Sequence, residues 1–272
     1  MDSFFHFLRG MSGRNPEPSQ NGNSEGDRRK GPGLPDCTRD ISGSLSRPDF
    51  SSINLPEIKE ELRRRSQESW TALVEALRAL ASASDRRSLY TRGHSERVTR
   101  FSGEVAEIMG LPEEEVGRIR IGGLIHDIGK ITIGEEILNK PAVLTEGEYE
   151  VMKTHTIRGY ELLKDILPLK DILPGMQFHH EQLDGKGYPC GLAGDEIPMI
   201  ARVITVADCF DAGTTIRPYQ EAPAPVEYVL GMIRSAAGVK YDETAVQALV
   251  HGVRTGRIVT RLEDRAPVKP DS

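Results

Sequence analysis

The stretch Gly122-Gly-Leu-Ile-His126-Asp127-Ile-Gly-Lys130 places a His and an Asp side by side among apolar residues, with a Lys three positions after the Asp. Imidazole and carboxylate groups are both common ligands of divalent metals. On a helix, residues 127 and 130 share a face, so Lys130 could meet an anion held near a metal at Asp127. The alternative is a helix end with a buried, hydrogen-bonded His126 and a capping Asp127, because short motifs also occur by chance.

The composition limits the classes of function. The 272 residues suffice for one large domain or two small ones. A formal net charge of −6 argues against binding a nucleic acid polymer, but it allows a small anionic ligand in a local pocket. No apolar run approaches the roughly 18 residues that span a bilayer. Cys37, Cys190 and Cys209 form no CxxC pair, which fits a reducing cytoplasm, and we interpret Cys190 and Cys209 as non-ligands because nothing pairs them with a base.

Residues 1–54 are predicted to be a disordered arm. Beyond residue 10 they are rich in Gly, Pro, Ser, Asn and charge, and such a segment cannot bury enough surface to offset its conformational entropy. The first ten residues include Phe4 and Phe5 but are too short for a signal-peptide core. A docking peptide for a partner or a membrane surface is the alternative to a disordered end.

Apolar residues at three-to-four spacing predict a series of helices. The first lies in segment 55–84 and ends near Ser82, and its polar middle, 63–68, suggests that its first turns project into solvent or towards a dimer partner. Further helices are predicted over 94–109, from 112 to 126, from 146 through 163, over 170–182, over 200–210, after 225, and from 242 to about 253.

Strand-like alternation is nearly absent, so we expect an all-α domain over 85–254, followed by a loose tail over 255–272. The β-branched run 203–206 lies inside a longer segment with helical spacing. Segment 183–196 is too rich in Gly to form a regular element and is predicted to be a loop.

Histidines cluster where helices are predicted to end. Each alone could be a hydrogen-bonded core residue, but together with Asp127 and Asp208 they indicate a metal centre. Mixed imidazole and carboxylate ligands suit Fe, Mn or Zn in a site other than a structural zinc site, and seven ligands point to two adjacent ions that share a carboxylate. The histidines in question are His94, His126, His155, His179 and His180, while His251 is interpreted as a surface or helix-end residue.

An ordered set of motifs over about residues 88–250 resembles the HD-GYP family, a branch of the HD phosphohydrolases. The set is far more specific than a His-Asp pair alone. Its pieces are Tyr90-Thr-Arg-Gly-His94, His126-Asp127-Ile-Gly-Lys130, Met152-Lys-Thr-His155, His179-His180-Glu181, Gly187-Tyr188-Pro189, Val206-Ala-Asp208 and Arg217-Pro-Tyr219.

The resemblance implies an HD-type helical bundle that hydrolyses cyclic di-GMP with two divalent ions, Fe or Mn. Lys130 would contact phosphate, Tyr188 would border the substrate, and Arg217 would help to bind it. Tyr188 either stacks on a guanine or covers the edge of the core. The implied ligands are His94, His126, Asp127 and Asp208 for one ion, and His155, His179 and His180 for the second, with Asp127 as the bridge. The resemblance leaves open which of His179 and His180 serves which ion.

Several charged residues beside the motifs have two interpretations. Glu181 and Asp184 are either hydrogen-bond partners of the His pair or exposed loop acids. Asp211, one helical turn after Asp208, is expected to orient a metal ligand or Lys130. Arg97 and Arg202 are expected to form structural salt bridges and not phosphate contacts.

The sequence departs from the family at several positions. Some members carry a Glu that recruits a third metal where this chain has Tyr90, so two metals are expected. Ser88 replaces a frequent Asp. Ile216 and Gln220 replace an acid and a base on the substrate side, so affinity or the choice of cyclic dinucleotide could differ.

Three hypotheses of function follow. The leading one is metal-dependent hydrolysis of cyclic di-GMP to the linear pGpG or on to GMP. The second is a signalling adaptor that binds a cyclic dinucleotide or a diguanylate cyclase with little turnover. The third is a related hydrolase acting on another nucleotide, which the Gly187-Tyr188-Pro189 loop opposes. The segment 55–84 could form a homodimer or pack on its own domain, and the source is expected to be bacterial.

Overall fold

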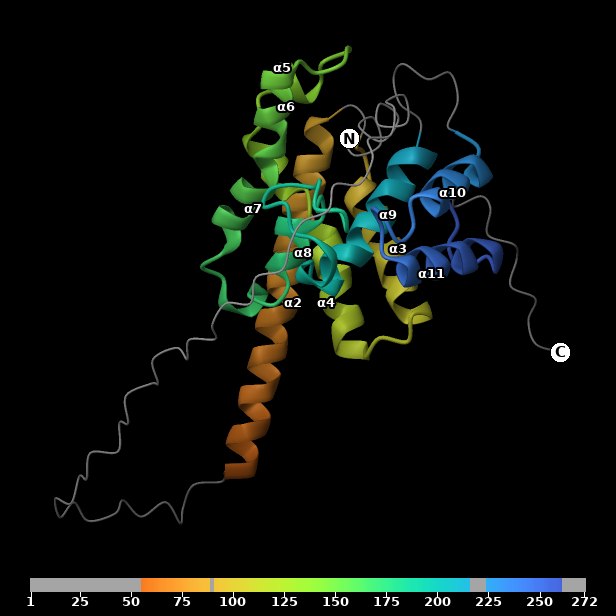
Figure 1. The fold of residues 1–272 in the computed structure, drawn as a ribbon. Helices are drawn as coiled ribbons and strands as arrows, with labels where there is room; N and C mark the ends of the chain where they lie inside the picture. Colours follow the sequence, from red (N-terminus) through yellow and green to blue (C-terminus); the bar gives the residue numbers. More distant parts are fainter. Residues whose placement is uncertain (1–54, 89–90, 216–223, 261–272) are drawn as a thin grey trace, which may run out of the picture.

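The computed structural model describes residues 55–88, 91–215 and 224–260, and it shows an all-α bundle with no strand in these ranges. This confirms the predicted fold class (Figure 1). The elements are α2 (Leu55–Arg87), α3 (His94–Ile108), α4 (Glu113–Ile125), η1 (Ile128–Thr132), α5 (Glu135–Leu138), α6 (Glu146–Lys153), α7 (His155–Leu163), η2 (Leu167–Leu169), α8 (Leu173–Phe178), η3 (Gly194–Glu196), α9 (Met199–Thr214), α10 (Val226–Ser235) and α11 (Glu243–Arg254).

Some predictions concern residues outside the described ranges. They are the predictions for the arm 1–54, for Cys37, Tyr90, Ile216, Arg217 and Gln220, and for most of the tail.

Helix α9 is the centre of the bundle. It is buried over most of its length and packs against α3, α4, α8, α10 and α11. The rings of Phe101 on α3 and Phe210 on α9 meet edge to face, with 5.5 Å between their centroids. The β-branched run 203–206 lies inside this helix, as its spacing predicted. A helix that is apolar nearly all round belongs in a core, and here it fixes the position of Asp208.

The second half of α2 packs on the bundle, and its first half projects away from it (Figure 1). Leu77 joins Leu124 of α4 and Met176 of α8 in a buried cluster. Towards the amino end, Arg64 and Glu68 are exposed and bond to each other. The predicted projection of the first turns is therefore observed, and what they contact outside this chain stays a prediction.

Three helix boundaries differ from the sequence predictions. Helix α2 continues to Arg87, beyond the expected end near Ser82. The single helix expected from 146 to 163 is broken at Thr154, whose N–H and hydroxyl both donate to the carbonyl of Val151. The helix expected over 170–182 is reduced to α8. The bonds of Thr154 to Val151 are side-chain and turn contacts that periodicity does not encode.

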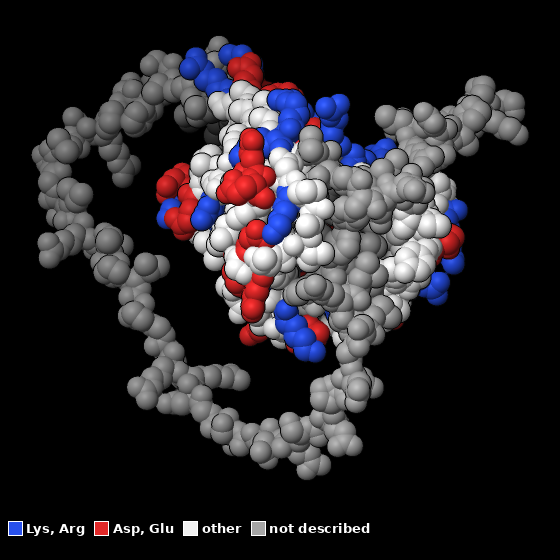
Figure 2. Space-filling model, turned by 90° about the horizontal axis from the view of Figure 1, so that it is seen from above, with Lys and Arg blue, Asp and Glu red and all other residues white. Residues whose placement is uncertain are grey.

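Two predicted helix starts are observed. Thr145 and Glu148 form a capping box at α6, and the Asp242 side chain accepts the N–H of Ala245 at α11. No helix in the described ranges is both long enough and apolar enough to span a membrane. Lys and Arg alternate with Asp and Glu on the face seen in Figure 2.

Candidate metal centre

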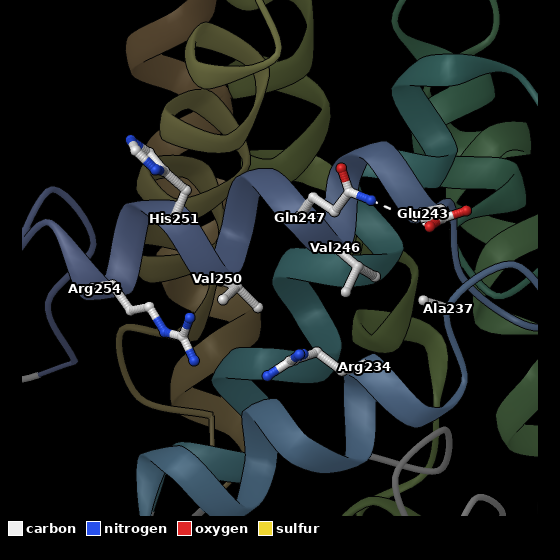
Figure 3. Close-up of a pocket in the computed structure, with 8 residues that line it drawn as sticks. All are labelled: Arg234, Ala237, Glu243, Val246, Gln247, Val250, His251 and Arg254. Carbon is white, nitrogen blue, oxygen red and sulfur yellow. Dashed lines mark hydrogen bonds between the residues drawn. The ribbon is translucent and has the colours of Figure 1, made fainter.

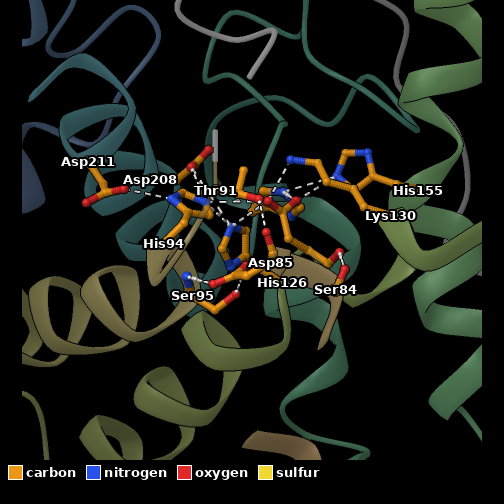
Figure 4. A network of polar contacts seen from close by, with 12 residues as sticks. Ser84, Asp85, Thr91, His94, Ser95, His126, Lys130, His155, Asp208 and Asp211 are labelled. Carbon is orange, nitrogen blue, oxygen red and sulfur yellow. Dashed lines mark hydrogen bonds and ion pairs between the residues drawn. The ribbon is translucent and has the colours of Figure 1, made fainter. Parts of the chain in front are cut away.

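The predicted metal ligands converge in the core from five segments. They come from the first residues of α3 and α7, from the ends of α4 and α8, and from the middle of α9. All are buried. Their ligand atoms form three groups, each within 4.8 Å: His94, His126 and Asp208; His126, Asp127 and His179; and His155, His179 and His180. Figure 4 shows part of this network from close by, with His94, His126, His155 and Asp208 labelled.

Three imidazoles are held in the same way. The Nδ1 of His126, His155 and His179 lies 2.7, 2.8 and 2.7 Å from the backbone carbonyl three residues earlier. A carbonyl can only accept, so we assign the ring N–H to Nδ1 and leave a lone pair on Nε2. Carbonyls at helix ends lack helical partners, which is why this local geometry recurs. The result is a set of imidazoles oriented to bind a metal through Nε2.

Asp127 lies between two sets of these nitrogens. Its Oδ2 is 3.4 Å from Nε2 of both His94 and His126, and its Oδ1 is 3.4 Å from Nε2 of His155 and 4.0 Å from that of His179. Oδ1 is buried and accepts no hydrogen bond from the described residues. A buried carboxylate oxygen that faces imidazole lone pairs is unfavourable unless a cation lies between them. The donor set therefore fits a divalent metal.

The carboxylates of the centre are ionised despite their burial. Burial alone would raise the pKa of Asp127, but the ammonium of Lys130 holds it well below its usual range. Burial likewise opposes the ionised Asp208, and contact with His94 keeps its pKa well below the usual range. Ionised carboxylates are the form that binds cations.

The imidazoles divide into two kinds. Burial and neighbouring imidazoles hold the pKa values of His179 and His180 well below the usual range, and burial lowers the pKa of His155 to about 4. Burial also opposes the charged form of His94, but three adjacent carboxylates raise its pKa well above the usual range. His155, His179 and His180 are thus neutral near pH 7 and able to bind a metal.

Lys130 lies next to Asp127, on the face that the sequence predicted for it, and its expected contact with an anion stays a prediction. Its Nζ lies 2.6 Å from Asp127 Oδ2, and both side chains are buried. Lys130 belongs to the 3-10 helix η1 and not to an α-helix.

Asp211 orients a candidate ligand. Its Oδ2 is 2.7 Å from Nδ1 of His94, and it also accepts from the guanidinium of Arg97. Of the two roles expected for Asp211, the structure places it against the ligand and not against Lys130. The salt bridges expected for Arg97 and Arg202 are also observed, the latter to Asp195 and Asp242.

Glu181 corrects both expectations from the sequence. It is buried, so it is not an exposed loop acid, and no hydrogen bond joins it to the His pair. Its carboxylate instead accepts the N–H groups of Cys190, Gly191 and Leu192 at 2.7, 3.1 and 3.0 Å. An irregular loop leaves such N–H groups without ladder partners, and a buried Glu next to it is the signal that could have indicated this role.

Tyr188 belongs to the loop whose N–H groups bond to Glu181, and it lies next to the candidate metal centre. Its ring stacks on that of His180 with 4.7 Å between centroids, and the edge of Tyr149 lies nearby. Asp184 is a partly exposed loop residue that accepts the N–H of Lys186. Neither Cys190 nor Cys209 belongs to the groups of candidate ligands in the described ranges.

Sequence reasoning missed three residues at the end of α2. Ser84, Asp85 and Arg87 contact segments that carry Asp127, His94 and Lys130. No periodicity or motif predicts contacts over such separations, so no sequence signal was available.

A separate groove of about 470 Å³ lies between α10 and α11 (Figure 3). Its basic residues, Arg234, His251 and Arg254, are in the last turns of these helices, where cations interact favourably with the helix dipole. His251 is exposed there, as predicted, and belongs to none of the groups of candidate ligands.

Fold and site together define an all-α protein with a buried His/Asp centre of the metal-binding kind. The model of the HD domain family matches residues 76–245. The chain belongs to the HD domain family, and the predicted resemblance to its HD-GYP branch is confirmed.

Similar proteins bear names that concern cyclic dinucleotides. A cyclic di-GMP phosphodiesterase of Thermotoga maritima is 41% identical over 65% of this chain and 49% of its own length. The 3'3'-cGAMP-specific phosphodiesterase 3 of Vibrio cholerae is 36% identical over 61% of this chain and 36% of its own length. The chain thus spans half or less of these relatives.

A solved structure shares the fold. The crystal structure of a cyclic GMP-AMP specific phosphodiesterase of V. cholerae aligns with a TM-score of 0.54 at 19% identity. The alignment covers 68% of this chain and 50% of that one.

Proposed function

We propose that this domain is a metal-dependent phosphodiesterase that hydrolyses cyclic di-GMP to pGpG or GMP. The observation that carries the proposal is Asp127, whose two oxygens face two sets of imidazole nitrogens while Lys130 contacts one of them. The 41% identity to a protein named a cyclic di-GMP phosphodiesterase supports this choice of substrate.

The centre would hold two divalent ions, Fe or Mn. Asp127 would be their shared ligand, and the donors on either side are those already described. Bound there, the ions would supply Lewis acidity and an activated water for attack on a phosphodiester.

The protein's own groups prepare the site for an anion. Lys130 is a buried ammonium that binds a phosphate oxygen and stabilises the charge that develops on it during hydrolysis. Asp211 fixes the orientation of His94 through Nδ1. Tyr188, whose ring stacks on that of His180, would border a nucleobase, and Arg217 would bind the substrate.

A second candidate is the same reaction on another cyclic dinucleotide. The 36% identity to a phosphodiesterase named for 3'3'-cGAMP favours it. The departures at Ile216 and Gln220 lie in the motif expected to face the substrate. A homodimer through α2, a diguanylate cyclase partner and a cytoplasmic location stay predictions.

The test is turnover of both dinucleotides side by side. Protein purified without oxygen would be reloaded with Fe(II) or Mn(II), metal content measured, and products separated by chromatography. The variant His126→Ala/Asp127→Ala should lose metal and turnover, while His251→Ala, an exposed His outside the centre, should keep both. A wild-type protein that holds two metals yet leaves both dinucleotides intact would instead support a binding adaptor.

A further inference from the structure

We propose that Arg87, in the last turn of α2, is a positioning residue that fixes Lys130 for catalysis. The inference rests on the proposed function, since it assigns Lys130 to the reacting phosphate. Helix α2 itself contributes no residue to the groups of candidate ligands in the described ranges.

Arg87 binds the backbone of the segment that carries Lys130. Its Nη1 donates to the carbonyls of Lys130 and Ile131 at 3.1 and 2.6 Å, and its Nη2 donates to that of Ile133 at 3.1 Å. The carbonyl of Arg87 in turn accepts from the Asn139 side chain at 2.9 Å. One guanidinium thus caps the carboxyl end of η1 from another helix.

Segment η1 depends on such external contacts because it is a 3-10 helix of five residues. On its other side Gly129 presses against α7, where an added Cβ would lie 1.9 Å from the carbonyl oxygen of His155. Arg158 of α7 donates to the carbonyl of Thr132 at 3.0 Å. The backbone of Lys130 is therefore held between α7 and the end of α2.

The same turn of α2 also contacts two candidate ligand segments (Figure 4). Asp85 accepts the N–H and hydroxyl of Ser95 at 3.0 and 2.8 Å, and so caps α3, which has no side-chain cap of its own and begins at His94. The hydroxyl of Ser84 lies 3.4 Å from the carbonyl of Asp127. The end of α2 is thus built onto the centre, and Arg87 is its contact with the Lys130 segment.

The chain offers a matched control in Arg86. It is adjacent in sequence, is exposed, and donates to the hydroxyl of Ser82, one turn earlier on the same helix. Removing its guanidinium changes the charge as Arg87→Met does, but it leaves η1 untouched.

The first test is a double-mutant cycle of Arg87→Met with Lys130→Met on metal-loaded protein. We expect Arg87→Met to lower kcat about tenfold or more, with KM changed less than about threefold. The double variant should turn over no more slowly than Lys130→Met alone. The reason is that Arg87→Met acts by displacing the ammonium that Lys130→Met removes. Arg87→Lys should recover part of kcat, and Arg86→Met should resemble wild type.

Effects of Arg87→Met and Lys130→Met that multiply in the double variant would overturn the proposal, as would an Arg87→Met variant with wild-type kcat. A general loss of stability predicts multiplication, so the cycle separates it from positioning.

The second test does not depend on turnover. Amide hydrogen exchange over residues 128–133 should be at least about tenfold faster in Arg87→Met than in wild type or Arg86→Met, with α9 as the internal reference. Unchanged exchange over these residues would show that Arg87 does not hold the Lys130 segment, even if the enzyme is active. Absence of turnover in wild type, with faster exchange in the variant, would overturn the proposed function but would still show that Arg87 holds the Lys130 segment.

Discussion

The two sides of the centre differ in charge and in the helices that support them. His94, His126 and Asp208 form one side, and they lie on α3, at the end of α4 and on α9, helices of 15, 13 and 16 residues. We call this the carboxylate side. The imidazole side, His155, His179 and His180, lies on or next to α7 and α8, helices of 9 and 6 residues.

The difference bears on the proposal that Asp127 is shared by two ions. The carboxylate side has Asp208 as its own anion, and Asp211 lies behind His94. The imidazole side has neutral rings, and Oδ1 of Asp127 lies 3.4 Å from Nε2 of His155. An ion on the carboxylate side would therefore be held more tightly, and both sides would depend on Asp127.

The largest expected effect comes from Asp127→Asn, which keeps the shape but removes the shared charge. We expect loss of metal from both sides and a fall in turnover of at least about a thousandfold. Metal analysis of purified protein and a turnover assay would check this. Asp184→Asn is the matched control, because Asp184 lies in the loop and caps only Lys186. If Asp127→Asn keeps both metals, Asp127 is not the ligand that the two ions share.

The second prediction compares the two sides directly. We expect wild-type protein to release metal to a chelator in two steps. His155→Ala should abolish the early, weakly held step, and Asp208→Asn should abolish the late one, each leaving about one ion per chain. Metal release would be followed with a chromogenic chelator, and circular dichroism would establish that both variants are folded. The reverse assignment, or one shared step in all proteins, would contradict the proposed inequality.

The sequence predicted the carboxylate side better than its surroundings, for a physical reason. Amphipathic spacing and helix starts are local, so α3, α4 and α11 were expected close to their observed bounds, while α9 continues to Thr214, beyond its expected end at 210. The convergence of the histidines followed from their places at helix ends, where the bond from Nδ1 to the carbonyl three residues earlier is also local.

The remaining features, which sequence reasoning did not predict, depend on contacts that helical spacing does not encode. The break at Thr154 and the shortening of α8 occur where the chain turns to bring His155 and His179 inward. Thr205 of α9 donates to the carbonyl of His179 at 2.7 Å, a contact that no spacing encodes. Arg87 acts on backbone groups of a distant segment, so its side chain alone gave no indication of its role.

The third prediction concerns the loop next to the imidazole side. Glu181→Gln keeps one acceptor oxygen but loses the charge that three N–H groups share, so we expect the free energy of unfolding to fall by about 1 kcal/mol. Urea denaturation would measure it. Burial raises the pKa of Glu181, which means that ionised Glu181 carries a cost in the folded wild type. Glu181→Gln removes this cost together with the charge, and this limits the fall in the free energy of unfolding. Glu196→Gln is the control, because the exposed Glu196 accepts one N–H of the same loop, that of Ala193. An equal change in both variants would show that Glu181 does not organise the loop.

The smallest expected effect is a pH dependence in α6, the helix that leads into α7 and the imidazole side. Bonds from Lys140 and from Thr145 lower the pKa of Glu148 from 4.5 to about 2. A carboxyl with a depressed pKa stabilises the folded state above its unfolded value and loses that contribution as pH falls through the folded value. Wild type should therefore exceed Glu148→Gln in urea midpoint near pH 6, and the difference should shrink between about pH 4.5 and about pH 2. The pair is partly exposed to solvent, so added salt should also reduce the difference. Glu150→Gln, whose bond to Lys153 lies on the same helix outside the capping box, should show a smaller dependence on pH. A difference that is constant across this range would mean that the capping box, and not the charge of Glu148, stabilises the start of α6.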